Sequence, residues 1–369
     1  MRGQTVPMLE VNLDKRGKEP VTAFPLGPQW PTIDPFLFVA HHLDHYPSGT
    51  DRLGPAASLD GRAIGNDFAG VDGWNMYHGS VVPGFPQHPH RGFETVTYLR
   101  TGVIDHSDSL GATARYGPGD TQWLTAGAGI VHSEMFPLLS TDHDNPLELF
   151  QIWLNLPRSN KMVDPHFTML WSEATPRVPV GSPAADGSES AATLIAGSLD
   201  GHRAQDPPPD SWAGNPDADV AIVHLELHPG STWTLPRVSD GVARVAYFYR
   251  GSKLAVGDSS AGGENGGRSV VEGGHGLQIG TGPVSFTAEG ETALVMILQG
   301  RPIGEPVAQY GPFVLNDRAG IEQAFADYQR TGFGGWPWER DDPVHDRDAG
   351  RFALRPDGGR ETPEPITVP

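Results

Sequence analysis

Short runs of β-forming residues, separated by glycine and proline turns, occupy most of this chain of 369 residues. The first half contains ETVTYLR, GDTQWLTA and LELFQIWLNL, and the second half contains VAIVHLELHPG and VARVAYFYRG. Short strands at this spacing are typical of sandwiches and barrels. We therefore expect an all-β fold, and the 47 glycines and 35 prolines indicate long loops between the strands.

The length and the distribution of these runs predict two units, each able to bury its own core. The segment between them is rich in proline and serine, which is typical of a linker. A helical pattern follows the last strand, and a charged, proline-rich tail comes after it. The expected parts are a first unit at 30–160, a linker at 161–192, a second unit at 193–335 with a helix near 317–330, and a tail at 336–369 that is mobile unless it docks.

Composition excludes several classes of site and partner. The chain has no cysteine, so disulfides, thiolate metal sites and thiol nucleophiles are excluded. The formal net charge is -19, which does not suit direct binding to nucleic acid. We find neither a signal peptide nor a stretch apolar enough to cross a membrane, so we expect a cytoplasmic protein without membrane contact.

Two histidine-containing pairs stand out in the first half. His88 and His90 are two residues apart in QHPHRGF, and His132 and Glu134 are two residues apart in IVHSEM. Residues at i and i+2 on a strand point to the same face, so each pair can aim at one point. Pro89 has no N–H to donate, which places the first pair at the start or edge of a strand.

Three imidazoles and one carboxylate suit a divalent transition metal and leave open positions on an octahedral ion. This chemistry favours Fe(II), with Mn, Ni, Cu, Co and Zn as alternatives. Spacing alone leaves the carboxylate open. Glu134 adjoins His132, whereas Glu94 shares the parity of His88 and His90 but reaches the metal only if the strand bends.

The blocks HPHRGFETVTY, GPGDTQWLTAGAGIVHSEM, FQIWLNLPRSNKM and YGPFVLNDRAGIEQAFADYQRTGFG resemble the signature blocks of the pirin family in the cupin superfamily. The resemblance implies two cupin barrels, with one iron in the first and no metal site in the second. It places the four metal ligands on His88, His90, His132 and Glu134, and so selects Glu134 over Glu94. It also implies that Glu134 can act as a general base.

The resemblance implies two alternative functions. Some pirins act as quercetin 2,3-dioxygenases, which would make a small aromatic flavonol and O₂ the substrates here. Others are metal-dependent, redox-sensitive partners of transcription factors or metabolic enzymes, so a protein partner is the alternative. A non-oxidative cupin, such as an isomerase, is a third hypothesis. We rank the dioxygenase first because open metal sites are generally used for chemistry.

Other candidate residues have simpler interpretations. Arg91 faces away from the histidine pair by parity, which predicts a structural salt bridge. His106 and Asp108 are expected in a surface turn. The histidines of HHLDH, at 41, 42 and 45, are expected to pack or to face solvent. Three segments are longer than in a typical pirin, namely 48–78, the loop GDSSAGGENGGRSV at 257–270, and the tail; the first is expected near the mouth of the site.

Overall fold

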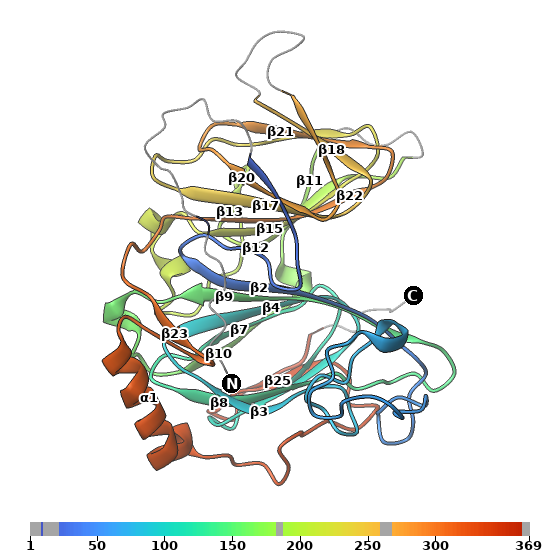
Figure 1. Ribbon diagram of the computed structural model, residues 1–369, viewed down its shortest axis with the longest axis vertical. Coiled ribbons are helices and arrows are strands. Elements are labelled where there is room, and N and C mark those ends of the chain that lie inside the picture. Colours follow the sequence, from blue (N-terminus) through green and yellow to red (C-terminus); the bar gives the residue numbers. More distant parts are fainter. Residues whose placement is uncertain (1–8, 10–21, 182–186, 259–267, 364–369) are drawn as a thin grey trace.

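The computed structural model describes residue 9 and residues 22–181, 187–258 and 268–363. Most of the loop at 257–270 and the last six residues lie outside these ranges. The described chain forms two units of antiparallel β-sheet that stack on one another, with one α-helix at the side (Figure 1). The predicted all-β architecture is confirmed.

The first unit is built from two sheets that face each other. One has five strands in the order β10 (His166–Leu170), β7 (Thr121–Thr125), β4 (Phe93–Thr101), β9 (Asn145–Asn155) and β2 (Phe36–Tyr46). The other has six strands in the order β26 (Arg360–Glu361), β25 (Phe352–Leu354), β6 (Thr113–Tyr116), β5 (Ile104–Asp108), β8 (Ile130–Met135) and β3 (Gly84–His90).

The second unit repeats this arrangement. Its seven-stranded sheet has the order β1 (Thr22–Pro25), β20 (His275–Ile279), β17 (Ala243–Arg250), β22 (Ala293–Gly300), β15 (Ala221–Leu227), β12 (Ala191–Ala196) and β11 (Arg177–Pro179). Its four-stranded sheet has the order β16 (Thr232–Leu235), β21 (Val284–Glu289), β18 (Lys253–Asp258) and β19 (Ser269–Glu272). The spatial order β3-β8-β5-β6 in the first unit matches the order β16-β21-β18-β19 in the second, because each series takes the first, sixth, third and fourth strands counted from β3 or from β16. This match supports an internal duplication.

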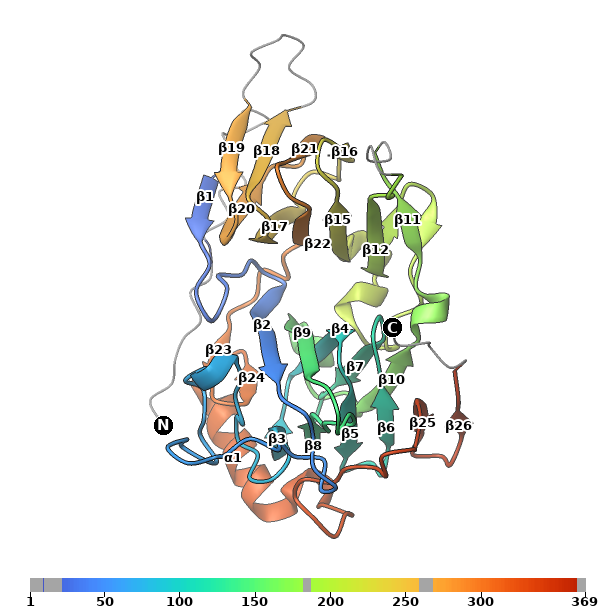
Figure 2. The same cartoon turned by 90° about the vertical axis from the view of Figure 1, so that its right-hand side faces the viewer.

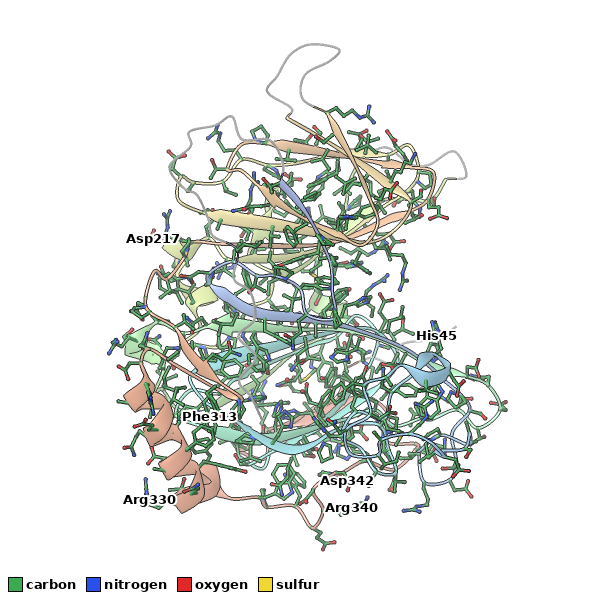
Figure 3. The ribbon with its side chains drawn as sticks, viewed as in Figure 1. His45, Asp217, Phe313, Arg330, Arg340 and Asp342 are labelled. Carbon is green, nitrogen blue, oxygen red and sulfur yellow. The ribbon has the colours of Figure 1, made fainter. Side chains whose placement is uncertain are left out.

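Helix α1 (Arg318–Thr331) covers the side of the first unit. It begins where expected, because the side chain of Asp317 accepts a hydrogen bond from the backbone N–H of Gly320 at 2.8 Å and so caps the first turn. Phe313, fully buried, lies between α1 and the barrel (Figure 3). The remaining elements are short: β13 (Ser198–Leu199), β14 (His202–Arg203), β23 (Ala308–Tyr310), β24 (Phe313–Leu315) and the 3₁₀ turns Val71–Gly73, Arg158–Asn160, Ser172–Ala174, Trp212–Gly214, Pro216–Ala218 and Gly332–Gly334.

An apolar layer joins the two units. The outer face of the five-stranded sheet meets the outer face of the seven-stranded sheet, and the side chains between them are almost all fully buried. Such burial stabilises a fold by about 25 cal/mol per Å² of apolar surface, so the two units are held as one body. The layer is formed by Val96, Tyr98, Trp123, Phe150, Ile152 and Leu154 on one side and Ile222, Val245, Tyr247, Met296 and Leu298 on the other.

The two ends of the described chain are exchanged between the units (Figure 2). The N-terminal strand β1 pairs with β20 in the second unit, while the C-terminal strand β25 pairs with β6 in the first.

The predicted linker is also wrong in part, because it contains β10, which pairs with β7, and β11, which pairs with β12. Edge strands of three to five residues are too short to show a periodic pattern.

The described part of the tail, residues 336–363, docks on the first unit, and Arg115 explains why. This side chain is buried and forms a bidentate pair with Asp105, with both N–O distances at 2.7 Å. Its remaining donors bind the backbone carbonyls of His345, Asp346 and Arg347 at 2.6 to 3.2 Å. All five guanidinium donors are therefore satisfied, three of them by the tail.

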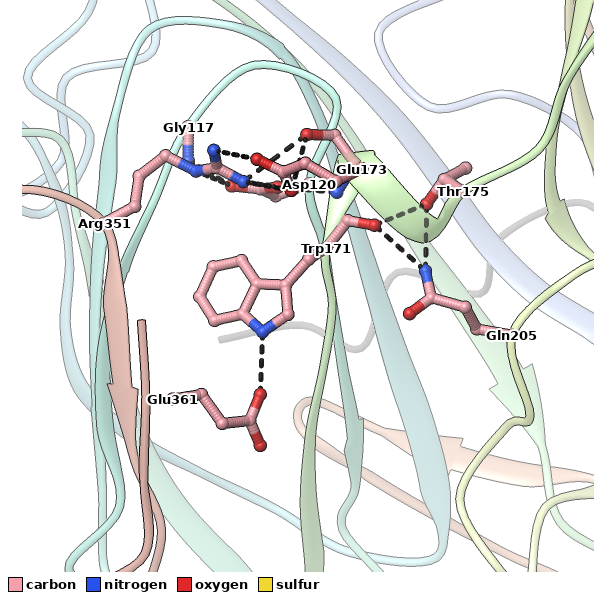
Figure 4. Close-up of polar contacts among 9 residues, drawn as sticks. Gly117, Asp120, Trp171, Glu173, Thr175, Gln205, Arg351 and Glu361 are labelled. Atoms are coloured by element: carbon pink, nitrogen blue, oxygen red, sulfur yellow. Dashed lines mark hydrogen bonds and ion pairs between the residues drawn. The ribbon is translucent and has the colours of Figure 1, made fainter. Parts of the chain in front are cut away.

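A second arginine fixes the tail further along (Figure 4). Arg351 donates to both oxygens of Asp120, at 2.9 and 2.7 Å, and to Glu173 at 2.7 Å. The indole N–H of Trp171 donates to Glu361 at 2.7 Å. The charged side chains of the tail thus pair with polar side chains more than a hundred residues away in the chain. These charges had led us to expect a solvent-exposed segment.

Candidate metal centre

Three histidines converge inside the first barrel. His88 and His132 are cross-strand partners on β3 and β8, and His90 follows on the same face of β3. Their ring centroids are 4.4 to 4.9 Å apart, and one nitrogen of each lies within 4.8 Å of the others. Among the described residues this is the only group of three or more such side chains that could hold a metal ion. As predicted from Pro89, β3 is an edge strand.

The ring nitrogens that make no hydrogen bond within the protein are available to ligate a metal. Nδ1 of His88 donates to the carbonyl of Pro86 at 2.9 Å, which leaves Nε2 as the free lone pair. The carbonyl of Pro312 is a hydrogen-bond partner of His90, while the buried Nδ1 of His90 and both nitrogens of His132 have no partner among the described residues. Ligating histidines commonly donate their second N–H to a carbonyl in this way.

Burial keeps these imidazoles neutral. It lowers the pKa of His88 to about 4 and holds the pKa values of His90 and His132 well below the ordinary value. Nearby imidazoles lower these pKa values further, because a second positive charge would repel the first. Neutral imidazole is the form that ligates a metal. The three side chains therefore offer lone pairs rather than charges to the centre of the group.

Glu134 lies beside the triad. Its Oε2 is 3.9 Å from Nε2 of His132, and burial raises the pKa of its carboxyl group. Thr97 donates to Oε1 at 3.0 Å and Gln151 donates to Oε2 at 3.3 Å, both from the five-stranded sheet. The group of mutually close donor atoms contains the three histidines and not Glu134, so its role as fourth ligand stays a prediction.

Glu94 points away from the metal group. Its carboxylate accepts hydrogen bonds from Thr125 at 2.7 Å and from Ser211 at 2.5 Å, in the layer between the two units. Alternation along a single strand would have placed Glu94 on the same face as His88 and His90. This expectation was wrong because the chain turns between β3 and β4, where Gly92 has φ 86°, a conformation that favours glycine. Glu94 is therefore neither a ligand nor a neighbour of the ligands.

His106 and Asp108 were wrongly expected in a surface turn. Both are fully buried on β5, where His106 is the cross-strand partner of Glu134. The ring of His106 lies 5.5 Å from that of His132, and its Nε2 is 3.1 Å from Asp108. The i and i+2 rule that located His88 and His90 applies equally to this pair and is the signal by which it could have been found.

Arg91 has the structural role that was expected. Its Nη1 is 2.9 Å from the carboxylate of Asp327 on α1, and its guanidinium lies over the ring of Phe333. The backbone N–H of Arg91 donates to Pro312 at 3.3 Å, and its carbonyl accepts from Val314 at 3.0 Å. The C-terminal segment thus fixes the strand end that carries His90.

His88 is the most exposed histidine of the triad: it is partly buried, whereas His90 and His132 are buried. Aromatic side chains lie around the triad. Trp153 lies 5.5 Å from the ring of His90 and 5.0 Å from that of Phe38. Phe85 lies 6.3 Å from the ring of His88. The site is therefore a polar centre flanked by aromatic side chains.

The corresponding place in the second unit is filled with apolar side chains. Trp233 on β16 and Phe286 on β21 are cross-strand partners, as His88 and His132 are in the first unit. Their rings stack with centroids 6.4 Å apart, within a large buried apolar cluster. The second interior has the packing of a core.

Comparison with known proteins agrees with this architecture. The profile of the family described as "Pirin" matches residues 23–154, and that of the "Pirin C-terminal cupin domain" matches residues 222–334. A crystal structure of quercetin 2,3-dioxygenase from Acinetobacter baumannii has a TM-score of 0.65 and 23% identity, over 86% of this chain and 98% of that one. At this identity the likeness shows the cupin fold alone.

Curated relatives match over most of their own length. A Pseudomonas aeruginosa protein named "Putative quercetin 2,3-dioxygenase PA3240" is 37% identical over 67% of this chain and 79% of its own. Human "Pirin" is 32% identical over 71% of this chain and 81% of its own. No helix among the described residues is long and apolar enough to cross a membrane.

Proposed function

This chain belongs to the pirin family, and from that premise we propose that it is a metal-dependent dioxygenase that cleaves a flavonol such as quercetin with O₂. One observation carries the proposal: three imidazoles lie with donor atoms within 4.8 Å of one another, beside the buried carboxyl group of Glu134. The name of the Pseudomonas relative supports the choice of substrate class.

We propose Fe(II) as the metal, held by His88, His90, His132 and Glu134. Nitrogen and carboxylate donors suit Fe(II), and they also admit Mn, Ni, Cu, Co and Zn. Bound there, the ion would supply Lewis-acid polarisation of a substrate oxygen and open coordination positions. The hydrogen bonds that His88 and His90 donate to the carbonyls of Pro86 and Pro312 support this ligand set because they orient the rings.

The side chains around the centre would position the substrate and move its proton. Glu134 is held by Thr97 and Gln151 at its two oxygens, so Oε2 can accept the proton of the flavonol 3-hydroxyl as a general base. Trp153 and Phe93, whose rings lie 4.3 Å apart, form an apolar wall next to His90. Such a wall excludes water from the activated ring.

Turnover of quercetin by metal-loaded protein, measured with and without O₂, tests the proposal. We expect consumption of quercetin and release of carbon monoxide only in the presence of O₂. Lack of turnover with Fe, Mn, Ni, Cu and Co would refute the dioxygenase. A host protein that binds the metal-loaded wild type but not the His90→Ala variant would then support the alternative function, a metal-dependent binding protein.

Elemental analysis of the protein purified from its host tests the ligand assignment. We expect Glu134→Gln to weaken metal binding roughly tenfold or more, since it replaces an anionic donor by a neutral one. Glu94→Gln is the matched control, because it makes the same change to a buried carboxyl on the other sheet of the unit, which faces away from the metal group. Metal loss in the control alone would overturn the assignment.

A further inference from the structure

We infer that Phe68, in the long segment 48–78, is a specificity-determining residue that holds the distal aromatic ring of the substrate at the mouth of the metal centre. This inference rests on the proposed function for the identity of the substrate class. It concerns a residue of segment 48–78, which we expect to be longer than in a typical pirin, and not the metal ligands.

Phe68 is an exposed aromatic side chain with 53% of its surface accessible. Its ring nevertheless belongs to a cluster of rings, with centroids 5.4 Å from Tyr77, 5.2 Å from His78 and 6.4 Å from Phe85. An exposed ring beside other rings offers a surface on which an aromatic ligand can pack.

The backbone that carries Phe68 is rigidly fixed. The preceding residue, Asp67, is buried and accepts hydrogen bonds from Arg62 and from the backbone N–H of Met76, both at 3.0 Å. Asp67 also forms a two-way backbone bridge with Tyr77, at 2.8 and 2.9 Å. The exposed ring is therefore presented on a preorganised base, which lowers the entropy lost when a ligand is bound.

Phe85 links this ring to the metal centre. Its ring stacks on Tyr77 at 5.0 Å and lies 6.3 Å from the ring of His88, the most exposed histidine of the triad. A single ring thus separates Phe68 from the first imidazole. A planar ligand with an oxygen at the triad would extend over Phe85 and end against Phe68.

This arrangement selects a class of ligand. Aromatic rings favour offset or edge-to-face contacts with other rings, so an extended planar molecule gains from Phe85 and Phe68 in turn. A small hydroxy acid could reach the triad but would leave both rings uncovered. The geometry points to a multi-ring aromatic compound, as a flavonol is.

Two probes separate the ring contacts from the metal. Flavonol (3-hydroxyflavone) has the oxygen that would bind at the triad, while flavone has the same rings and lacks that hydroxyl. We would titrate each into metal-loaded wild type, Phe68→Ala, Phe68→Tyr and Val71→Ala, following absorbance. Val71 is a second exposed apolar side chain of the same segment, at 44%, and is the matched control. Thermal unfolding monitors folding of every variant.

We expect Phe68→Ala to weaken both probes roughly five- to tenfold, the usual effect of one aromatic pair. Phe68→Tyr should restore binding, and Val71→Ala should leave it unchanged. In quercetin turnover, Phe68→Ala should raise KM by the same factor and leave kcat unchanged, because the ring acts at a distance from the reacting atoms.

The outcomes separate this inference from the proposed function. If the wild type binds flavone through Phe68 but does not turn over quercetin, the dioxygenase is refuted and the aromatic site stands. If quercetin is turned over and Phe68→Ala binds both probes as the wild type does, the inference is overturned and the dioxygenase stands. Failure of the wild type to bind either probe also overturns the inference.

Discussion

Replacing Glu94 by glutamine should change how stability depends on pH while leaving the metal centre intact. Glu94 is fully buried between the two units, and burial raises the pKa of its carboxyl from 4.5 to about 7, despite hydrogen bonds from Ser211 and Thr125 that favour the ionised form. The folded protein therefore holds this proton more tightly than the unfolded chain does. Glutamine keeps the shape of the side chain and removes the titration.

The sign follows from linkage. The stabilisation due to the held proton is complete below the unfolded pKa of 4.5 and is lost as pH rises through about 7. The difference between the folded and unfolded pKa values contributes about 3 kcal/mol to the free energy of unfolding at low pH. Roughly 2.5 kcal/mol of this contribution is lost between about pH 5 and about pH 8. For a chain of 369 residues, that equals a shift in Tm of about 3 °C.

Thermal unfolding of metal-free wild type and Glu94→Gln across this pH range is the assay. We expect the Tm of the wild type to fall relative to that of the variant by about 3 °C between about pH 5 and about pH 8. A constant difference between the two proteins would refute the buried, proton-holding carboxyl. Metal content, measured in parallel, should be equal.

Two further substitutions test contacts near the metal centre and in the tail. Thr97→Val removes the hydroxyl that donates to Glu134 and should weaken metal binding by roughly tenfold. An unchanged Kd for the metal would show that this hydrogen bond does not orient the carboxylate. Arg115→Met leaves Asp105 buried without its partner and should cost about 3–5 kcal/mol, with faster proteolysis at the tail. The exposed Arg340, changed in the same way, should alter neither, and equal proteolysis of both variants would contradict the docking.

The convergence of the histidines was predictable from local rules. His88, His90 and His132 follow the two-residue alternation of strands, and the turns between the runs allow neighbouring strands to pair. The helix was predictable as well, because Asp317 and the apolar spacing that follows are local signals. The alternation and the helix cap depend on residues close together in the chain, whereas the meeting of His88 with His132 comes from the pairing of β3 with β8.

Features that depend on breaks in alternation or on distant partners could not be predicted. Glu94 is an even number of residues from His88 and His90, which predicted the same face of one strand. The turn at Gly92 instead places Glu94 on a different sheet. The tail read as charged and aperiodic because the partners of its charges, such as Asp120 for Arg351, lie more than 200 residues away. Long-range pairing of this kind leaves no periodic signal in the segment itself.

The two barrels show that one strand order can enclose either a reactive site or a core. In the first, His90 and His132 have buried ring nitrogens without a hydrogen-bond partner among the described residues, a costly arrangement unless a ligand satisfies them. In the second, Trp233 and Phe286 fill the same place and stabilise by burial alone. The second barrel and the docked tail therefore supply packing energy and hold the first barrel in shape, which allows its interior to remain polar. Burying polar groups without partners costs free energy, and a fold can tolerate this cost when packing stabilises it in other places.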